Sequence, residues 1–306
     1  MSTRFAETMP LRAASREVVR ELGFLMPRFH AADVTHAQCH ALLEVHQAGR
    51  ATAAEVAERL KIDKSTASRT VTDLVRKRLL RIAPDSDQRR RPVELTASGV
   101  KKVEQIDVLA SRQVDESLGL LADAERGTVL AGMQLYAKAL SRRRRRREFA
   151  IRPIDRADDP QIARVIREVM TEHGASGPGF AIHDPEVSAM SVAYGRPRAA
   201  YFVVVHRGKV VGGGGIASLE GGQKDTCELR KMYFLPEARA LGLGAEMLAR
   251  CLATAREKRF KTCYLETLKS MRAARRLYES FGFRPLGKPL GATGHFGCDA
   301  WYSLAL

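Results

Sequence analysis

Cysteine is scarce in this sequence, and long apolar runs are missing from it. The 5 cysteines form no Cys-x-x-Cys pair and are odd in number, so they do not follow the pattern of a disulfide framework. No stretch approaches the roughly 18 apolar residues needed to cross a bilayer. The N-terminus MSTRFAETMP also lacks the apolar core of a signal peptide. These absences predict a cytoplasmic protein with reduced thiols and no membrane partner.

Basic side chains exceed acidic ones. Lys and Arg number 51 against 35 Asp and Glu, which gives a formal charge of +16 at pH 7. This balance favours a polyanionic partner, although solvated surface charge produces the same excess. At roughly 150 residues per domain, a chain of this length is expected to form two domains.

Apolar residues recur at three- and four-residue spacing through residues 11–147, and this pattern predicts helices, interrupted only around 80–96. The remaining chain alternates predicted strands with helices. The strands are expected at Ala199–His206, Lys209–Ala217, Cys227–Leu235, Thr262–Leu268 and Ala300–Leu306. The fold class is therefore multidomain, with an all-α domain at 1–147 followed by an α/β or α+β domain with a mixed sheet at 148–306.

Two predicted helices, Thr52–Leu60 and Lys64–Arg78, are joined by a tight connection in which Asp63 is placed to cap the second. The outer face of the second helix carries short hydrogen-bonding side chains and two cations: Lys64, Ser65, Thr66, Ser68, Arg69 and Thr72. Such a face can enter a major groove, where Ser and Thr contact bases or phosphates and Arg pairs with guanine. The exposed polar face of an ordinary helix has a similar composition.

Two short predicted strands around a charged tip follow this helix pair. The tip contains Asp87, Arg89 and Arg90, and the exit has the form Leu-Thr-x-x-Gly, ending at Gly99. Together these segments resemble the MarR family of dimeric transcriptional regulators over residues 11–145. The resemblance implies a winged helix-turn-helix fold in which a wing arginine, Arg89 or Arg90, enters the minor groove and is oriented by Asp87.

The same resemblance implies a homodimer. Its interface would be built from the flanking helices Leu11–Pro27, Ala97–Leu121 and Asp123–Leu140. A two-fold dimer implies a roughly palindromic operator in double-stranded DNA.

Six consecutive arginines, Arg142–Arg147, follow the last of these helices. They cannot share one helical face, so mutual repulsion predicts an exposed run. One interpretation is a solvated linker between the domains, and the other is a supplementary contact with the DNA backbone.

His36 and His40 stand four residues apart on a predicted helix, with Cys39 and His46 nearby, and this spacing can bind a metal. Helix histidines without a ligand role explain the same pattern. Because no carboxylate-histidine cluster elsewhere in the sequence supports a metal site, none is predicted.

The predicted strand Cys227–Leu235 leads through a glycine-bearing turn into a helix that ends near Lys258. Glycines let the backbone approach phosphate closely, and free amides at a helix start favour an anion there. The dinucleotide-binding fingerprint is excluded, because its third glycine and its early position in a strand-helix-strand unit are missing.

The turn has the form Arg-x-x-Gly-x-Gly, and the strand Tyr264–Leu268 and the segment Ala273–Phe283 follow it. Together they resemble the GNAT superfamily of N-acetyltransferases over residues 149–306. The resemblance implies acetyl-CoA as co-substrate, with its pantetheine arm paired to strand backbone and its pyrophosphate on loop amides. The implied cofactor residues are Met232, Tyr233, Phe234, Arg239, Ala240, Leu241, Gly242, Leu243, Gly244 and Ala245.

An amine must lose a proton before it attacks a thioester, and the departing thiolate benefits from a proton donor. The GNAT resemblance implies Glu228 as the general base, against the alternative of a surface strand carboxylate. It implies Tyr278 as the donor, against the alternative of a core tyrosine. Met271 stands where many members carry an asparagine that bonds the cofactor, so that contact is not expected.

The acceptor is predicted to be a small amine or amino acid bound largely by the segment Thr171–Pro197. Arg196, Arg198 and Arg230 could hold a substrate carboxylate, although surface arginines are common in so basic a chain. The predicted function is a bifunctional transcriptional regulator and acetyl-CoA-dependent N-acetyltransferase. Two alternatives stay open: a regulator whose second domain only senses an acyl-CoA or an amine, and a protein lysine acetyltransferase.

Overall fold

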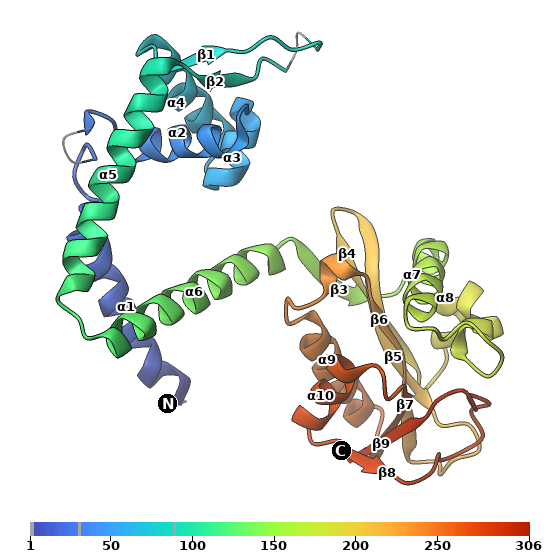
Figure 1. The fold of residues 1–306 in the computed structure, drawn as a ribbon. Coiled ribbons are helices and arrows are strands. Elements are labelled where there is room, and N and C mark those ends of the chain that lie inside the picture. Colours follow the sequence, from blue (N-terminus) through green and yellow to red (C-terminus); the bar gives the residue numbers. More distant parts are fainter. Residues whose placement is uncertain (1–2, 30–31, 88–89) are drawn as a thin grey trace. The chain divides into compact units, whose positions relative to one another are not determined.

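The computed structural model describes residues 3–29, 32–87 and 90–306, with backbone alone for residues 3–7. It divides the chain into two compact units, Met1–Val129 and Leu130–Leu306 (Figure 1). The first is helical with one small hairpin, and the second is built on a mixed sheet, so the predicted fold class is confirmed. The domain limits drawn from the sequence stay a prediction.

The apolar core of the first unit is formed mainly by α2, α3 and α4. Its elements are α1 (Thr3–Glu21), α2 (His36–Ala48), α3 (Ala53–Leu60), α4 (Lys64–Arg76), β1 (Leu80–Ile82), β2 (Val93–Leu95) and α5 (Ala97–Gly119), followed by the start of α6 (Asp123–Arg146). Leu42 of α2, Val56 of α3 and Leu74 of α4 are fully buried there. Strands β1 and β2 form an antiparallel hairpin with Leu80 opposite Leu95.

Local capping explains where the central helices begin. The Thr52 hydroxyl accepts from the Glu55 amide, and the Glu55 carboxylate accepts from the Thr52 amide, which makes a capping box at the start of α3. Asp63 caps α4 by accepting from the Thr66 amide at 2.8 Å. Lys61 adopts the left-handed conformation, with φ 59°, and ends α3 before the connection to α4.

Helix α6 continues through most of the arginine run. The predicted exposure is confirmed for Arg142–Arg145 and for Arg147, but Arg142–Arg146 are helical rather than a separate linker. Arginine has high helix propensity, and the C-terminal end of a helix favours cations, so the two effects outweigh repulsion between the solvated side chains. Arg146 is half-buried and pairs with Glu246.

The second unit has a seven-stranded sheet in the order β3-β4-β5-β6-β7-β9-β8, in which only β6 and β7 run parallel. The strands are β3 (Phe149–Pro153), β4 (Ala200–His206), β5 (Lys209–Ser218), β6 (Thr226–Phe234), β7 (Thr262–Thr267), β8 (Arg284–Leu286) and β9 (Ala300–Ala305). The five predicted strands are confirmed, and their ends lie within one residue of the prediction. The sequence did not predict β3 and β8.

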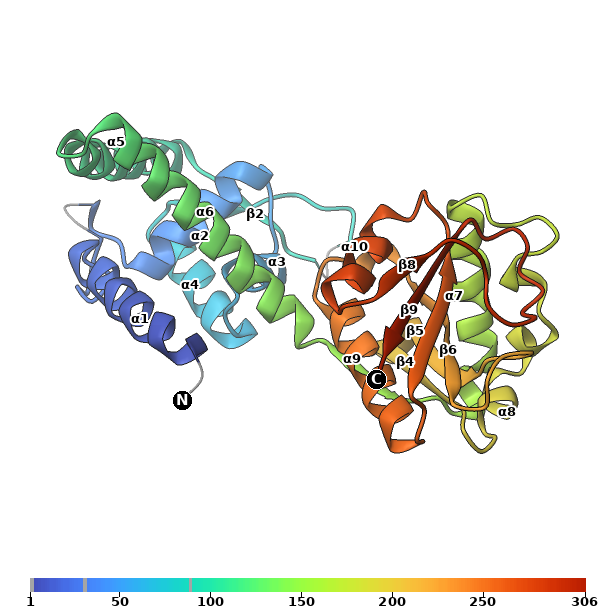
Figure 2. The ribbon, with the colours of Figure 1, turned by 90° about the horizontal axis from the view of Figure 1, so that it is seen from below.

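Helices cover both faces of this sheet. Figures 1 and 2 show α7 (Asp159–Glu172) and α8 (Met190–Tyr194) on one face, and α9 (Leu243–Glu257) and α10 (Arg272–Ser280) on the other. The central strands are therefore buried on both sides, so polar groups that they carry are removed from bulk water.

The middle of the sheet combines a glycine run with a bulge. A Cβ atom on Gly213 would lie 2.6 Å from the Tyr201 ring on one face of β5, and one on Gly214 would lie 2.8 Å from Met232 on the other face, so neighbouring side chains fill the space beside both glycines. Two residues of β6, Lys231 and Met232, lie opposite Gly214 alone. Lys231 is left-handed there, with φ 48°, and this bulge adds a residue to one face of the strand.

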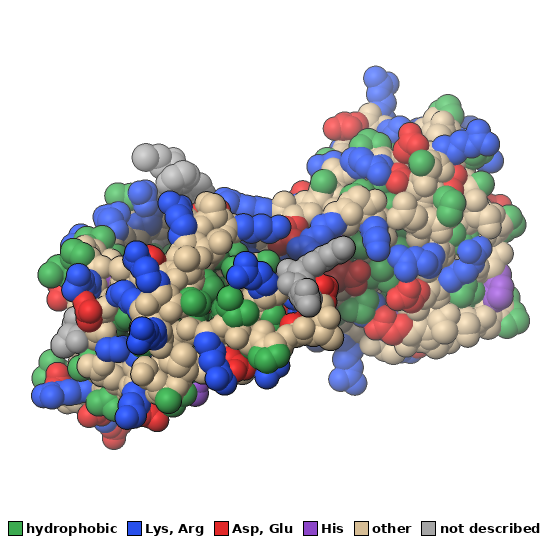
Figure 3. Space-filling model, turned by 90° about the horizontal axis from the view of Figure 1, so that it is seen from above, with side chains coloured by type: hydrophobic (Ala, Val, Ile, Leu, Met, Phe, Trp, Pro, Cys, Tyr) green, Lys and Arg blue, Asp and Glu red, His purple; other side chains and the backbone are tan. Residues whose placement is uncertain are grey.

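The surface is basic without one dominant patch on the face shown in Figure 3. There the Lys and Arg side chains are scattered over both units, with Asp and Glu between them. In the part of the chain that the structure describes, no helix has both the length and the apolar character to cross a membrane.

Candidate functional sites

Strands β6 and β7 diverge in the middle of the second unit. They pair only from Thr226–Glu228 to Thr262–Tyr264, and beyond these residues the described strands share no ladder pair. The rest of β6 therefore turns backbone groups towards an opening instead of a neighbouring strand. A free strand edge of this kind can pair with an extended ligand that carries amides.

The predicted pyrophosphate loop joins β6 to α9. Ala240 and Gly242 both have positive φ, 58° and 81°, and Gly242 precedes the first residue of α9 without a capping side chain. Alternating conformations of this kind make a concave row of amides that suits an anion. The cavity beside the loop has a volume of about 490 Å³. It is lined by Val169, His173, Met232, Tyr233, Phe234, Ala238, Arg239, Ala240, Gly244, Ser270, Met271, Arg272, Ala273, Ala274, Arg276 and Leu277.

Most of the predicted cofactor residues therefore surround one cavity, but Arg239 is already paired. Its guanidinium donates two hydrogen bonds of 2.6 Å to Glu172 on α7 and one of 2.8 Å to the Phe234 carbonyl. The bonds from Arg239 lower the pKa of Glu172. The geometry gives Arg239 a role in holding the loop, and its phosphate contact stays a prediction.

Tyr278 lies on α10 and is 6% exposed. Its ring packs against Phe283 and Tyr302, with centroid distances of 5.9 and 6.4 Å. Burial raises the pKa of Tyr278, so the phenol keeps its proton at neutral pH. None of the described residues makes a hydrogen bond to its hydroxyl, which is thus available to another partner.

Glu228 is 2% exposed, so the alternative of a surface carboxylate is wrong. It lies on β6, where both faces of the sheet are covered. Burial raises the pKa of Glu228, while Arg230 favours the charged form by donating a hydrogen bond of 2.6 Å from Nε. A carboxyl group whose pKa is moved towards neutral pH is suited to accept a proton there.

A second cavity, of about 730 Å³, lies over the α7 and α8 face of β6. Its lining comes partly from the segment predicted to bind the acceptor, and it includes all three arginines proposed to hold a carboxylate. Arg230 is engaged by Glu228, and Arg198 lies 4.1 Å from the centroid of the Phe260 ring and donates to the Lys224 carbonyl. Arg196 is exposed at the cavity.

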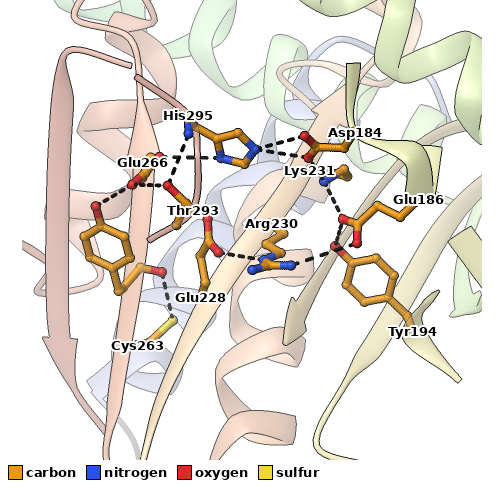
Figure 4. A network of polar contacts seen from close by, with 11 residues as sticks. Asp184, Glu186, Tyr194, Glu228, Arg230, Lys231, Cys263, Glu266, Thr293 and His295 are labelled. Carbon is orange, nitrogen blue, oxygen red and sulfur yellow. Dashed lines mark hydrogen bonds and ion pairs between the residues drawn. The ribbon is translucent and has the colours of Figure 1, made fainter. Parts of the chain in front are cut away.

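A network of charged side chains beside this cavity was not predicted (Figure 4). Lys231 is 1% exposed in its side chain, and its Nζ lies 2.7 Å from Asp184 and 2.5 Å from Glu186. His295 Nε2 lies 3.0 Å from Asp184, and His295 Nδ1 lies 3.5 Å from Glu266. Burial lowers the pKa of His295, but its contacts with Asp184 and Glu266 outweigh burial and raise it to about 9.

The network joins segments that lie far apart in the sequence. Asp184 follows a 3-10 turn before α8, Glu266 is on β7, and His295 is in the connection from β8 to β9. The sequence shows no carboxylate-histidine cluster, because only the folded sheet brings these groups together. The sequence does place His295 among the glycines at 291, 294 and 297, and glycines allow a segment to lie close to other backbone.

The predicted DNA-contacting residues of the first unit lie mostly on the outer face of α4. Lys64, Ser65, Ser68 and Arg69 are exposed, and Thr66 is half-buried. The hydroxyls of Ser65 and Thr66 donate to the Asp63 cap at 2.6 and 2.7 Å, which occupies their protons.

The hairpin β1–β2 borders this face. A groove of about 770 Å³ runs between α3, α4 and the hairpin, and Ser68, Thr72 and Arg90 are among its lining residues. Arg90 lies 3.4 Å from Glu55, and its amide donates to the Asp87 carbonyl. Arg89 lies outside the described residues, so its predicted minor-groove contact and its orientation by Asp87 stay predictions.

Two family models match this chain. The acetyltransferase (GNAT) family model matches residues 166–283, and the MarR family model matches residues 32–91. The first match covers the predicted pyrophosphate loop, strand β6, which lines both cavities, and α10. The second spans the helix pair and the first part of the hairpin.

Two curated relatives align with the acetyltransferase part. The uncharacterized N-acetyltransferase YjgM of Escherichia coli is 46% identical over 143 residues, which are 46% of this chain and 86% of that protein. The uncharacterized N-acetyltransferase C1271.07c of Schizosaccharomyces pombe is 33% identical over 63 residues, which are 21% of this chain and 39% of that protein.

Among solved structures, an acetyltransferase of Streptococcus agalactiae is 16% identical, with a TM-score of 0.46, and covers 52% of this chain and 99% of its own. An acetyltransferase of Salmonella typhimurium, solved with its cofactor acetyl-CoA, is 20% identical, with a TM-score of 0.41, and covers 51% of this chain and 93% of its own.

Proposed function

This chain belongs to the GNAT acetyltransferase family and carries a MarR-family domain before its acetyltransferase domain. On that premise we propose that it is a DNA-binding regulator that also acetylates a small amine or amino acid. Both resemblances found in the sequence are thereby confirmed. The observation that supports the proposed chemistry is the buried carboxylate of Glu228, which accepts a hydrogen bond from Arg230 in the lining of the 730 Å³ cavity.

Acetyl-CoA is the proposed donor. The free edge of β6 at Met232–Phe234 pairs with the amides of the pantetheine arm, and the amides from Leu241 to Ala245 hold the pyrophosphate. The left-handed conformation of Gly242 supports this part of the proposal, because it turns successive amides towards one side of the loop.

The acceptor binds in the 730 Å³ cavity with its amine next to Glu228. Glu228 takes a proton from the ammonium group, and the freed amine attacks the thioester carbonyl carbon. The C–N bond forms, the C–S bond breaks, and Tyr278 gives its proton to the departing thiolate. The products are an N-acetyl amide and coenzyme A with a free thiol, while both side chains regain their protonation states from solvent.

The proposed DNA contact uses α4 and the hairpin. A MarR-family domain implies DNA binding; the cations Lys64 and Arg69 of α4 are exposed, and Ser68 of the same helix lines the groove together with Arg90. We place α4 in the major groove and the hairpin tip in the minor groove of a double-stranded operator.

The proposed form is a homodimer with a palindromic operator. Helices α1, α5 and α6 leave large apolar side chains exposed, a feature typical of protein interfaces. These side chains are Met9, Leu11, Val18, Val19, Val108, Val114, Val129, Leu130, Met133, Leu135, Tyr136 and Leu140. A second copy of the chain would remove them from water.

Thiol release from acetyl-CoA over a panel of amines, amino acids and a lysine-containing protein tests the enzymatic part. We expect turnover with a small amine or amino acid in the wild type and a loss of about 10²–10⁴-fold in Glu228→Gln. Binding of acetyl-CoA without thiol release from any acceptor would favour the sensor alternative. Release only with the protein acceptor would favour a lysine acetyltransferase.

A further inference from the structure

We propose that Glu228, Glu266 and His295 form a binding site for a divalent transition-metal ion of the Zn²⁺ class. Each residue offers one ligand atom, and these atoms lie within 4.8 Å of one another. Tetrahedral ligands at about 2.0–2.2 Å from one zinc ion stand about 3.3–3.6 Å apart, so the three side chains need only a small approach to surround an ion. The three residues come from β6, from β7 and from the connection before β9, so the sheet assembles the site.

Each candidate ligand has one polar atom that is hydrogen-bonded to a neighbouring side chain and a second that can face a metal ion. Glu266 Oε1 accepts hydrogen bonds from the Tyr264 hydroxyl at 2.7 Å and from the Thr293 hydroxyl at 3.0 Å. Glu228 Oε2 accepts from Arg230 Nε at 2.6 Å. His295 Nε2 lies 3.0 Å from Asp184, which leaves Nδ1 for a metal. Metal ligands in proteins are typically fixed by such outer partners, a carboxylate behind a histidine among them.

One atom of the cluster, Glu266 Oε2, has an ion-pair contact but no hydrogen bond from the described residues. The Glu266 side chain is only 4% exposed, and its Oε2 atom is buried. The nearest cation-forming group is His295 Nδ1, at 3.5 Å. A buried oxygen without a hydrogen bond loses the solvation it had in water, so this atom points to a ligand inside the cluster.

The charge around the cluster suits a dication. The network contains four carboxylates, those of Asp184, Glu186, Glu228 and Glu266, and two fixed cations, Arg230 and Lys231. With a neutral, metal-binding imidazole, two negative charges are left over, and a divalent ion balances them.

An ion can reach the cluster through the 730 Å³ cavity, because His295 and Thr293 are among its lining residues. Three protein ligands leave one position of a tetrahedral zinc ion for water or another small ligand. Since Glu228 is also the proposed general base, metal loading should slow acetyl transfer. That consequence rests on the proposed function, whereas the site itself does not.

Zinc chloride titrated into the metal-stripped full chain tests the site, with calorimetry for affinity and mass spectrometry for stoichiometry. We expect one ion per chain at this site, with Kd about 10⁻⁶ M or lower. Glu266→Gln keeps the acceptor for Tyr264 and Thr293 but should lower affinity by more than about 100-fold, and Asp184→Asn by about 10- to 100-fold. His40→Gln on α2 is the matched control, because that helix offers the other histidine spacing able to bind zinc.

Equal zinc affinity in the wild type, Glu266→Gln and Asp184→Asn, or no zinc bound by folded wild type, would overturn the site and leave His295 as an imidazolium between carboxylates. Circular dichroism checks that each variant folds. If Glu266→Gln does not fold, the zinc affinity of His295→Gln replaces it as the test. X-ray absorption at the zinc edge of the wild type then identifies the ligand atoms, which we expect to be nitrogen and oxygen only. Acetyl transfer is assayed separately, so an inactive enzyme that binds zinc refutes the proposed function and not the site.

Discussion

The two candidate sites of this chain place their polar groups in opposite environments. In the second unit Glu228 and Lys231 are buried in the sheet, and each has a charged partner within 3 Å. In the first unit Lys64, Ser68 and Arg69 are exposed on one helix. A buried charged group needs a partner, and burial shifts its pKa, whereas an exposed group is solvated and available to bind a ligand.

This difference predicts how each site responds to substitution. A buried group contributes to folding, to neighbouring pKa values and to chemistry at once, so replacing it changes several measurements together. An exposed group should change binding alone.

Tyr278→Phe should lower the turnover number by about 10²–10⁴-fold, the usual value of general acid help, while acetyl-CoA affinity stays nearly unchanged. The ring still packs against Phe283 and Tyr302, and only the hydroxyl without a described partner is lost. Steady-state kinetics and calorimetry measure the two quantities. Tyr136→Phe, at an exposed position on α6, is the control. Wild-type turnover in Tyr278→Phe would make Tyr278 a core residue.

Gly242→Val should weaken acetyl-CoA binding by about 100-fold or more, since loss of two hydrogen bonds to a charged group costs roughly 3 kcal/mol or more. A β-branched residue cannot readily adopt φ 81°, and its side chain would enter the space proposed for the pyrophosphate. Gly208→Val is a matched control. Gly208 has φ 79° and, like Gly242, an open surrounding, but lies in the turn from β4 to β5. Equal losses in both variants would point to general strain.

Arg69→Ala should lower operator affinity by about 1–3 kcal/mol, if its guanidinium reads a base, or reduce the salt slope by about 1 if it contacts phosphate. Fluorescence anisotropy with an operator selected from random duplexes, at several salt concentrations, separates the two. Arg76→Ala removes the same charge from the last turn of α4 and should have the smaller effect. Identical curves for both variants would contradict the assigned face of α4.

Acetyl-CoA together with an amine should shift operator affinity by about fivefold or more, at the low end of typical couplings. Helix α6 motivates this prediction, because it has residues in both compact units and continues as helix to Arg146. Operator titrations with acetyl-CoA, amine, both or neither measure the shift, and Gly242→Val should abolish it. Superimposable wild-type curves in all four conditions would mean that the units act independently.

The same contrast explains what the sequence could predict. The helix pair and five strands rest on local signals, namely the caps at Thr52 and Asp63, helical spacing, and runs of apolar residues. The exposed residues of α4 could be named because one helix presents them all. The loop before α9 could be located from its glycine spacing and a family resemblance, whereas its contacts with a phosphate stay a prediction.

The charged network could not be predicted in this way. Asp184, Lys231 and His295 come from three segments, and two of these are connections outside the strands, so only the complete tertiary fold brings the groups together. The burial of Glu228 has the same origin, since its strand alone does not tell whether helices cover both faces. The short strands β3 and β8 were missed because they lie at the sheet edges, where packing contributes more than pattern.

The bulge in β6 has a consequence for insertions and deletions. Lys231 is the extra residue, and the residues on either side of it keep a regular alternation with β5. Glu228, Arg230 and Tyr233 therefore face one side with or without it. The adjacent cations Arg230 and Lys231 can both face that side only because the bulge adds one residue to the strand. Deleting Lys231 would leave a regular strand, and Asp184 and Glu186 would lose the lysine that pairs with both of them.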